Sequence, residues 1–381
     1  MTGSLTGPNG AKSASPRYYI KVLGKAIEII NAMGRIRSGA RLSDIADACH
    51  LDLATALRIL HTFERHGWVA KDARTKKFKL LVGSRQYRVG YAQLRRGLPF
   101  SDAVTHGLVE AARLALVELL PLDNEFDADK AIEHARWMIR EKVDFAIECQ
   151  RHAKVAPVLA DMFAKAHIPT LAIDIPQPGA LYFGPNNYTS GLTLGQAAGA
   201  FVHKKWQGGL DQVLLLEAFA AGPHPHSRIV GFLEGLQGAV KGRGARRVVR
   251  RDGKGTEQDS YRAALKFFRE ISPRKRVLIA AINDISALGA IRAAKELGRE
   301  QHTGVVGNDL SPVERVLAEI KDAGSPFIAT ICTFPEEYGK KILSIILRWL
   351  RNEQVPPTTY TETALVVREN VDEFLVRTHL Q

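Results

Sequence analysis

The sequence predicts an α/β protein in which a small N-terminal domain precedes a large body of two lobes, each built on a doubly wound parallel sheet. Three observations support this prediction. The chain has 381 residues, enough for two or three domains. Its first quarter shows three helix-like segments followed by two short strand-like segments. From about residue 86 onward, short apolar strands alternate with amphipathic helices, as in parallel sheets that are covered on both faces.

The positive charge of the chain is concentrated near its N-terminus. The net charge is +13, and residues 1–86 hold 15 Lys and Arg against 6 Asp and Glu. A local positive excess favours a polyanion such as DNA, because each neutralised phosphate releases counterions. A basic surface that merely keeps the protein soluble is the alternative. Residues 1–17 are rich in Gly, Ser and Pro, so we expect a disordered leader there and no secretion signal.

Several classes of protein are disfavoured by what the sequence lacks. No apolar run reaches the roughly 18–20 residues that cross a bilayer. Cys49, Cys149 and Cys332 are odd in number and far apart, which argues against a disulfide framework or a zinc site. GxSxG, HExxH, P-loop and GxGxxG motifs are absent. We therefore expect a cytoplasmic protein that is not an enzyme, with no catalytic residue, cofactor or metal, and we interpret His224 and His226 as ordinary loop residues.

Residues 18–85 are predicted to form a winged helix-turn-helix. Segments 18–37, 41–50 and 52–67 have helical periodicity, and 68–72 and 77–83 form two strands around a basic turn. The expected inner face of the first helix holds Leu23, Ala26, Ile27, Ile30 and Met33, and that of the third holds Leu53, Leu57 and Leu60. The expected DNA contacts are Thr55, Arg58, Thr62 and Arg65 on the third helix and Arg74, Lys76 and Lys77 in the wing. A solvated helix face and a charged loop tip are the alternative for these residues.

The remainder of the chain supplies enough strands for two sheets. The predicted strands are 87–92, 114–119, 143–148, 169–174, 181–184, 212–218, 246–251, 276–283, 303–309, 327–332 and 363–367. We expect lobe 1 to comprise about 86–187 and 334–357, and lobe 2 about 188–333 and 358–381. Only residues 82–86 separate the wing from the first strand of lobe 1, so movement of the lobes should be passed to the N-terminal domain.

The N-terminal pattern resembles the IclR-type winged helix of bacterial regulators. The resemblance covers about residues 18–84 and rests on LSDIA at 42–46, TALRIL at 55–60 and FERHGWV at 63–69. It implies that Thr55 and Arg58 lie at the DNA surface.

Residues 86–371 resemble the type I periplasmic sugar-binding proteins and the effector domains of lactose-repressor-type regulators. The resemblance rests on seven motifs in the family's order: LPFS (98–101), IPTLAID (168–174), GPNNY (184–188), RIVGF (228–232), NDISALGA (283–290), GND (307–309) and TICTFP (330–335). It implies a ligand cleft between two lobes and a homodimer on double-stranded DNA.

The candidate ligand residues follow predicted strands. In open parallel sheets, the loops beyond the carboxyl ends of strands meet at a crevice, where short carboxylates and amides can fix the hydroxyls of a polyol. The resemblance implies that Asp174, Asn283 and Asp309 contact the ligand and that Phe100 is a stacking wall. The other expected ligand positions are Ser101, Ile175, Asn187, His226 and Thr333. Helix capping or loop bracing is the alternative for Asp174, Asn283 and Asp309, and a helix cap or hinge brace for Asn187.

Three positions depart from the sugar-binding pattern. Ile175 and His226 stand where the family often has arginine, and Thr333 stands where it has glutamine. The loss of two guanidinium groups removes bidentate hydrogen bonds to neighbouring hydroxyls. We therefore expect a ligand other than a common pentose or hexose in the usual pose, such as a smaller, deoxygenated or more apolar sugar derivative.

Together these features predict a ligand-responsive transcriptional regulator. We expect a repressor that binds operator DNA through the winged helix and a sugar or polyol in the cleft between the lobes. One alternative is a non-catalytic sugar receptor that docks a protein partner. The other is a sugar-modifying enzyme, for which no acid/base pair is visible.

Overall fold

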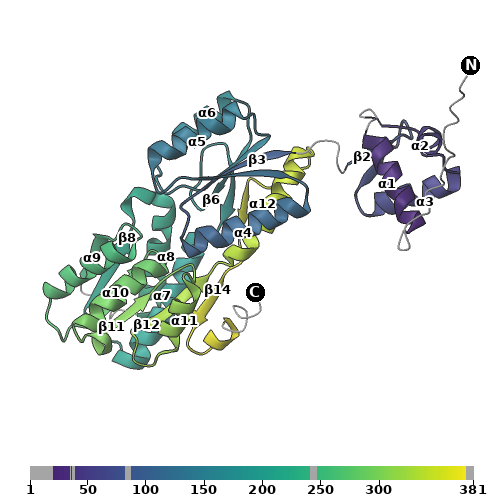
Figure 1. Ribbon diagram of the computed structural model, residues 1–381. Helices are drawn as coiled ribbons and strands as arrows, with labels where there is room; N and C mark the ends of the chain where they lie inside the picture. The colour runs from purple at the N-terminus through teal and green to yellow at the C-terminus, as the bar shows by residue number, and fades with distance from the viewer. Residues whose placement is uncertain (1–19, 35, 37–38, 82–86, 241–246, 375–381) are drawn as a thin grey trace, which may run out of the picture. The chain divides into compact units, whose positions relative to one another are not determined.

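The computed structural model divides the chain into two compact units, Met1–Gln86 and Tyr87–Gln381 (Figure 1). It describes residues 20–34, 36, 39–81, 87–240 and 247–374. The expected leader (1–17) and the connection 82–86 lie outside these residues. No helix in the described part of the chain is both long and apolar enough to cross a membrane.

The N-terminal unit is a winged helix, as the sequence predicts. Its elements are α1 (Lys21–Gly34), α2 (Leu42–Ala48), α3 (Leu53–Arg65), β1 (Val69–Lys71) and β2 (Phe78–Leu80). Strands β1 and β2 pair antiparallel, and Ala40 adds a bridge to Phe78. Asp52 begins α3 by accepting a hydrogen bond from the Thr55 amide at 2.8 Å, and Gly67, with φ of 70°, follows its end.

The core of this unit corrects part of the predicted helix faces. Leu23 and Ile27 on α1 and Leu53 on α3 are more than half exposed, although each was expected to be buried. Leu53 is the first residue of its helix and lies off the buried stripe. The buried residues of the three helices are Ile29, Met33, Ile45, Ala46, Ala56, Ile59, Leu60 and Phe63. Met33 on α1 and Leu60 on α3 are buried as predicted, so the error concerns only part of the expected faces of α1 and α3.

Lobe 1 is built on a six-stranded parallel sheet of order β13-β7-β6-β5-β3-β4. Its strands are β3 (Arg88–Gln93), β4 (Glu118–Asp123), β5 (Phe145–Glu148), β6 (Thr170–Ile173), β7 (Leu181–Gly184) and β13 (Thr358–Tyr360). Helices α4 (Pro99–Leu114) and α12 (Pro335–Leu350) cover one face, and α5 (Ala128–Arg140) and α6 (Ala156–Lys165) cover the other (Figure 1).

Lobe 2 repeats this plan with the order β14-β12-β11-β10-β8-β9, in which only β14 is antiparallel among the described pairings. Its strands are β8 (Gln212–Glu217), β9 (Arg247–Asp252), β10 (Val277–Ala281), β11 (Thr303–Val306), β12 (Phe327–Cys332) and β14 (Ala364–Val367). One face packs on α7 (Asn187–Trp206) and α8 (Pro223–Val240), and the other on α9 (Glu257–Arg269), α10 (Asp284–Glu296) and α11 (Val313–Lys321). In both sheets the winding reverses beside the first strand, β3 or β8, and ligands bind at such switch points.

Two predictions about lobe 1 were wrong. The expected strand 114–119 is the end of α4 and a turn, and β4 begins only at Glu118. The sheet tolerates Pro121 within β4 because β4 is an edge strand. Strand β13 was not predicted, so the chain returns to lobe 2 after Tyr360 rather than after residue 357.

Helices α7 and α8 approach each other backbone to backbone. A Cβ on Gly191 or Gly195 would overlap the carbonyl oxygen of Arg228 or Phe232, respectively, and a Cβ on Gly235 would overlap that of Leu192. Glycine is required at these positions because no side chain fits between the two helices.

Candidate ligand-binding site

A cavity of about 600 Å³ opens where the strand-end loops of the two lobes face each other. Lobe 1 contributes the loops after β3, β4, β5 and β6, and lobe 2 contributes those after β8, β9, β10 and β11. Its size suits a small organic ligand. The structure brings five of the nine expected ligand residues to its lining: Phe100, Asp174, Ile175, Asn283 and Asp309.

Asp174 follows β6 and presents a carboxyl group that is not satisfied by the protein. Its Oδ1 atom is buried and has no hydrogen-bond partner among the described residues. Burial, together with the nearby carboxylate of Asp309, raises the pKa of Asp174 to about 7, and Arg228 opposes this shift. Near neutral pH the group can therefore donate a hydrogen bond to a ligand as well as accept one.

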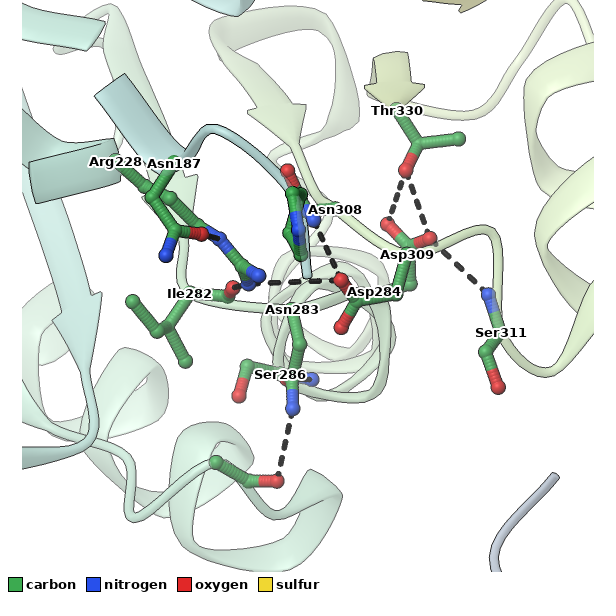
Figure 2. A network of polar contacts seen from close by, with 12 residues as sticks. Asn187, Arg228, Ile282, Asn283, Asp284, Ser286, Asn308, Asp309, Ser311 and Thr330 are labelled. Atoms are coloured by element: carbon green, nitrogen blue, oxygen red, sulfur yellow. Dashed lines mark hydrogen bonds and ion pairs between the residues drawn. The ribbon is translucent and has the colours of Figure 1, made fainter. Parts of the chain in front are cut away.

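Asp309 occupies the corresponding place in lobe 2. Its Oδ1 accepts a hydrogen bond from Asn308 Nδ2 at 2.5 Å and lies 3.5 Å from Arg228 Nη1 (Figure 2). Asp309 and Asp174 both have positive φ angles, of 101° and 61°. This conformation is unfavourable for residues with a Cβ, and its presence in these two of the cleft-lining carboxylates is typical of a functional site.

Arg228 is the central cation of the lobe 2 wall and was not predicted as a ligand residue. Its Nη1 donates to the carbonyl of Ile282 at 2.8 Å and its Nε donates to Asn187 Oδ1 (Figure 2). The side chain is only 11% exposed. The cleft therefore retains one guanidinium group, while Ile175 and His226 still stand where the family often has arginine.

Asn187 was expected to contact the ligand, but its side chain lies behind the cavity. It is buried, does not line the cleft and positions the guanidinium of Arg228. Its neighbour Asn186 caps α7 by accepting from the Thr189 amide at 3.1 Å. The contacts of Asn187 therefore match the alternative interpretation, in which this residue braces the structure and does not contact the ligand.

Asn283 lines the cavity, but its amide is used within the protein. Its Oδ1 caps α10 by accepting from the Ser286 amide at 2.9 Å, and its Nδ2 donates to the carbonyl of Gly255 at 3.2 Å (Figure 2). Asn283 was expected to contact the ligand, with helix capping as the alternative, and these contacts match the alternative. The amide links the loops after β9 and β10 and so shapes this side of the cleft.

Asp284 is buried in lobe 2, behind the residues that line the cavity. Burial raises its pKa to about 8. Its carboxyl accepts from Thr330 Oγ1 at 2.7 and 2.8 Å and from the Ser311 amide at 3.3 Å (Figure 2). A Cβ at Gly307 would overlap Asp284 Oδ1, so glycine is needed there for the carboxyl to reach its partners.

The three remaining predicted ligand residues do not line the cavity. Ser101 is buried in α4, where its Oγ accepts from the Arg95 amide at 3.5 Å. His226 is on α8 rather than in a loop, and its Nδ1 lies 2.6 Å from Glu217 Oε2 beside a separate, smaller pocket. Thr333 is buried at a lobe crossing, where its carbonyl accepts from Thr361 Oγ1 at 3.2 Å.

No metal site emerges from the described part of the chain, where no three His, Cys, Asp or Glu side chains group suitably. His224 lies 2.9 Å from the hydroxyl of Tyr182, so the two histidines of this segment have different partners.

The opening of the cavity carries cationic residues that the sequence did not single out. Arg95 and Arg151 follow β3 and β5 of lobe 1, and Lys254 follows β9 of lobe 2. Arg151 Nη1 donates to the carbonyl of Lys254 at 3.2 Å, and the Ala153 amide donates to the carbonyl of Ala220 at the same distance. The two lobes therefore touch across the cleft. Both arginines follow strands, as Asp174 does, so their position could have identified them as candidates. They were not selected because charged residues in loops are usually solvated.

The expected DNA contacts lie on the surface of the N-terminal unit. On α3, Arg58, Thr62 and Arg65 are exposed and Thr55 is half-buried. In the wing, Arg74 and Lys76 are exposed and Lys77 is half-buried. Asp72 holds the wing turn, because its Oδ1 accepts from the amides of Arg74 at 3.0 Å and Thr75 at 2.6 Å.

Comparisons with known proteins agree with both units. Residues 89–354 match the periplasmic binding protein domain family, and residues 22–73 match the IclR helix-turn-helix domain. No curated protein matches the chain.

Solved structures share the fold of the body at low sequence identity. One is an ABC sugar transporter subunit from Rhodobacter sphaeroides 2.4.1, with 20% identity, a TM-score of 0.66 and coverage of 74% of this chain and 99% of that chain. Another is a periplasmic solute binding protein from Actinobacillus succinogenes 130z with bound D-allose, with 17% identity, a TM-score of 0.65 and coverage of 75% and 99%. A third is a solute binding protein from Bacillus halodurans C-125 with bound myo-inositol, with 20% identity, a TM-score of 0.65 and coverage of 77% and 98%.

Proposed function

This chain belongs to the periplasmic binding protein domain family, and we propose that it combines this domain with an IclR helix-turn-helix domain to regulate transcription in response to a small polar effector. One observation carries the proposal: a unit with an exposed basic helix and wing shares a chain with a ligand-sized cleft between two lobes. We propose that it acts in the cytoplasm as a homodimer on operator DNA and represses transcription.

The proposed effector is a sugar or polyol held between the lobes. The cleft offers Asp174 from lobe 1, Asp309 and Arg228 from lobe 2, and the ring of Phe100 as an apolar wall. Carboxylates and a guanidinium can fix several hydroxyls while a ring covers the apolar face of a sugar. The bound D-allose and myo-inositol of two structural relatives support this ligand class. Ile175 and Asn283 complete the proposed lining.

The proposed DNA surface consists of α3 and the wing. Thr55, Arg58, Thr62 and Arg65 would face the major groove, and Arg74, Lys76 and Lys77 would contact the backbone or minor groove. The family resemblance and the exposure of most of these side chains support this assignment.

We propose that the effector acts by population shift. A ligand held by Asp174 and Asp309 contacts both lobes and therefore favours the closed cleft. Contacts between the lobes, such as the bond from Arg151 to the Lys254 carbonyl, belong to that closed arrangement. Binding of DNA and of effector should then be thermodynamically coupled, each changing the affinity for the other by the same factor.

The test measures both activities on the full chain. Sites selected from a random DNA pool should bind the wild type and an R136A/R140A control, but bind an R58A/R65A variant at least ten-fold more weakly. A thermal-shift screen with D-allose, allitol and myo-inositol should identify a stabilising ligand, since one present at 100 times its Kd adds about 2.7 kcal/mol. Equal DNA affinity of the R58A/R65A variant and the control would contradict the regulator proposal.

A further inference from the structure

Two arginines at the opening of the cleft share one aromatic ring. The guanidinium carbons of Arg151 and Arg95 lie 4.1 and 5.5 Å from the centre of the Phe126 ring. All three residues line the same cavity as Asp174 and Asp309. The ring therefore holds two like charges close together at the ligand site.

Neither guanidinium is neutralised by the described part of the protein. Among the described residues, neither arginine takes part in an ion pair with a carboxylate. Arg151 Nε is buried and has no hydrogen-bond partner there. Burial and the neighbouring charge of Arg95 lower the pKa of Arg151. Arg151 is thus charged at an electrostatic cost that a bound anion would relieve.

The acidic residues around the opening are engaged with other groups. Asp252 Oδ1 accepts from the amides of Phe219 at 3.3 Å and Lys254 at 2.9 Å. Glu257 forms two bonds of 3.0 Å with the guanidinium of Arg315. The negative charge of Asp252 does act on Arg151 from a distance, as does that of Asp259, but neither carboxylate forms an ion pair with it among the described residues.

Lys254 adds a third cation from the opposite lobe. Its ammonium group is largely exposed and lies 4.0 Å from Asp259 Oδ1, at the limit of an ion pair. Its carbonyl accepts the bond from Arg151, so the backbone of Lys254 is adjacent to the arginine pair. An anion held here would contact both lobes.

We propose that the effector carries an anionic group, a phosphate or a carboxylate, that binds Arg95 and Arg151 with help from Lys254. This inference rests on the proposed function only in taking the cavity as the effector site. Guanidinium groups suit this role because they bind phosphate and carboxylate oxygens in pairs. With Asp174, Asp309 and Arg228 at the same cavity, the ligand class is an acidic polyol, such as a sugar phosphate or a sugar acid.

The test uses the full chain with inorganic phosphate and acetate as probes. Affinity is measured by titration calorimetry at constant ionic strength, set with chloride. The variant R95Q/R151Q is compared with R113Q/R140Q, which removes the same charge from lobe 1 outside the cavity. Because the cationic N-terminal unit is unchanged in both proteins, any difference between them reports the cleft.

We expect the R95Q/R151Q variant to bind its preferred probe at least ten-fold more weakly than the R113Q/R140Q control does. The probe that binds the control more tightly identifies the anion as phosphate or carboxylate. Equal affinities in the two variants, or no binding of either probe by the wild type, would overturn the inference. If neither probe bound but neutral polyols stabilised the protein, the inference would fail and the proposed function would stand. If the anion bound but the protein did not bind DNA, the inference would stand and the proposed regulatory function would fail.

Discussion

The two walls of the cleft differ in how far the protein satisfies their buried charged groups. On the lobe 2 wall, Arg228 is bonded to Asn187 and Ile282 and lies next to Asp309. On the lobe 1 wall, Asp174 Oδ1 and Arg151 Nε are buried without a partner among the described residues. Paired groups fix the shape of a site, while unpaired buried groups gain most when a ligand arrives. The difference suggests a preformed lobe 2 wall and a lobe 1 wall whose interactions are completed by the ligand.

The largest change in stability should follow from removing the arginine of the lobe 2 wall. The substitution Arg228→Ala leaves Asp309 and Asn187 without their cation in a buried place, so we expect the unfolding free energy to fall by about 3–5 kcal/mol. Urea denaturation without ligand measures this loss. Lys321→Ala, which removes an exposed ion pair with Asp372 of the same lobe, should cost at most about 1 kcal/mol. Similar losses in both variants would contradict the comparison.

A smaller effect is expected from Asp174 on the lobe 1 wall, whose titration should make stability depend on pH. The pKa of Asp174 is about 7 in the folded protein and near 3.8 in the unfolded chain. Between about pH 4 and 7 the unfolded chain releases this proton and the folded protein keeps it, so stability falls as pH rises. Above pH 7 both states are ionised and the fall ends.

The variant Asp174→Asn should lack this component of the pH dependence. The unfolding free energy of the wild type relative to the variant should decline across this window by on the order of 2 kcal/mol, allowing for the partial exposure of the side chain. Asp161→Asn, at an exposed position on α6, should follow the wild type. A constant difference between wild type and Asp174→Asn would show that Asp174 titrates normally.

Removal of an unpaired cation should change stability less. Arg151→Gln loses the contact with Phe126 and the exposed bond to the Lys254 carbonyl but also ends the repulsion from Arg95, so we expect the unfolding free energy without ligand to change by no more than about 1 kcal/mol. The same urea experiment compares it directly with Arg228→Ala. A loss of unfolding free energy as large as that of Arg228→Ala would mean that the stability of the protein depends equally on the arginines of both walls.

The smallest effect concerns the wing, where the exposed Lys76 is proposed to contact DNA. If Lys76 contacts a phosphate, Lys76→Ala should reduce the slope of log affinity against log salt by about 0.9. Fluorescence anisotropy of a selected DNA site at several salt concentrations measures the slope. Lys266→Ala, on α9 of the body, should leave it unchanged, and an unchanged slope for Lys76→Ala would remove that residue from the DNA surface.

The sequence predicts the fold better than it predicts the site. Strand–helix alternation and the three-helix pattern are local signals, and they predict both units correctly. The strand expected at 114–119 failed because the β-favouring run Leu-Ala-Leu-Val-Glu-Leu is divided between a helix end and an edge strand. Strand β13 was missed because three residues on a sheet edge carry little periodicity.

Within the site, position at a strand end was predictable but side-chain pairing was not. Asp174 and Asp309 follow strands directly, so the rule for parallel sheets places them at the cleft. Arg228 lies on a helix, and only the packing of α8 against α7 brings it to Asp309. The pair formed by Arg95 and Arg151 arises from loops 56 residues apart in the sequence. Such pairing depends on tertiary structure, which no local pattern records.

The close approach of α7 and α8 determines which part of the protein can bend. Because their backbones touch at several glycines, Arg228 cannot shift relative to α7 without moving the helix pair as one rigid body. The chain crosses between the lobes only in the three connections that follow β7, β12 and β13 in the described structure, so we expect any rotation of lobe 2 against lobe 1 to occur there. In the proposed mechanism, a ligand bound to Arg228 therefore moves α7 and α8 together with their lobe, and little of its binding energy is absorbed by local rearrangement.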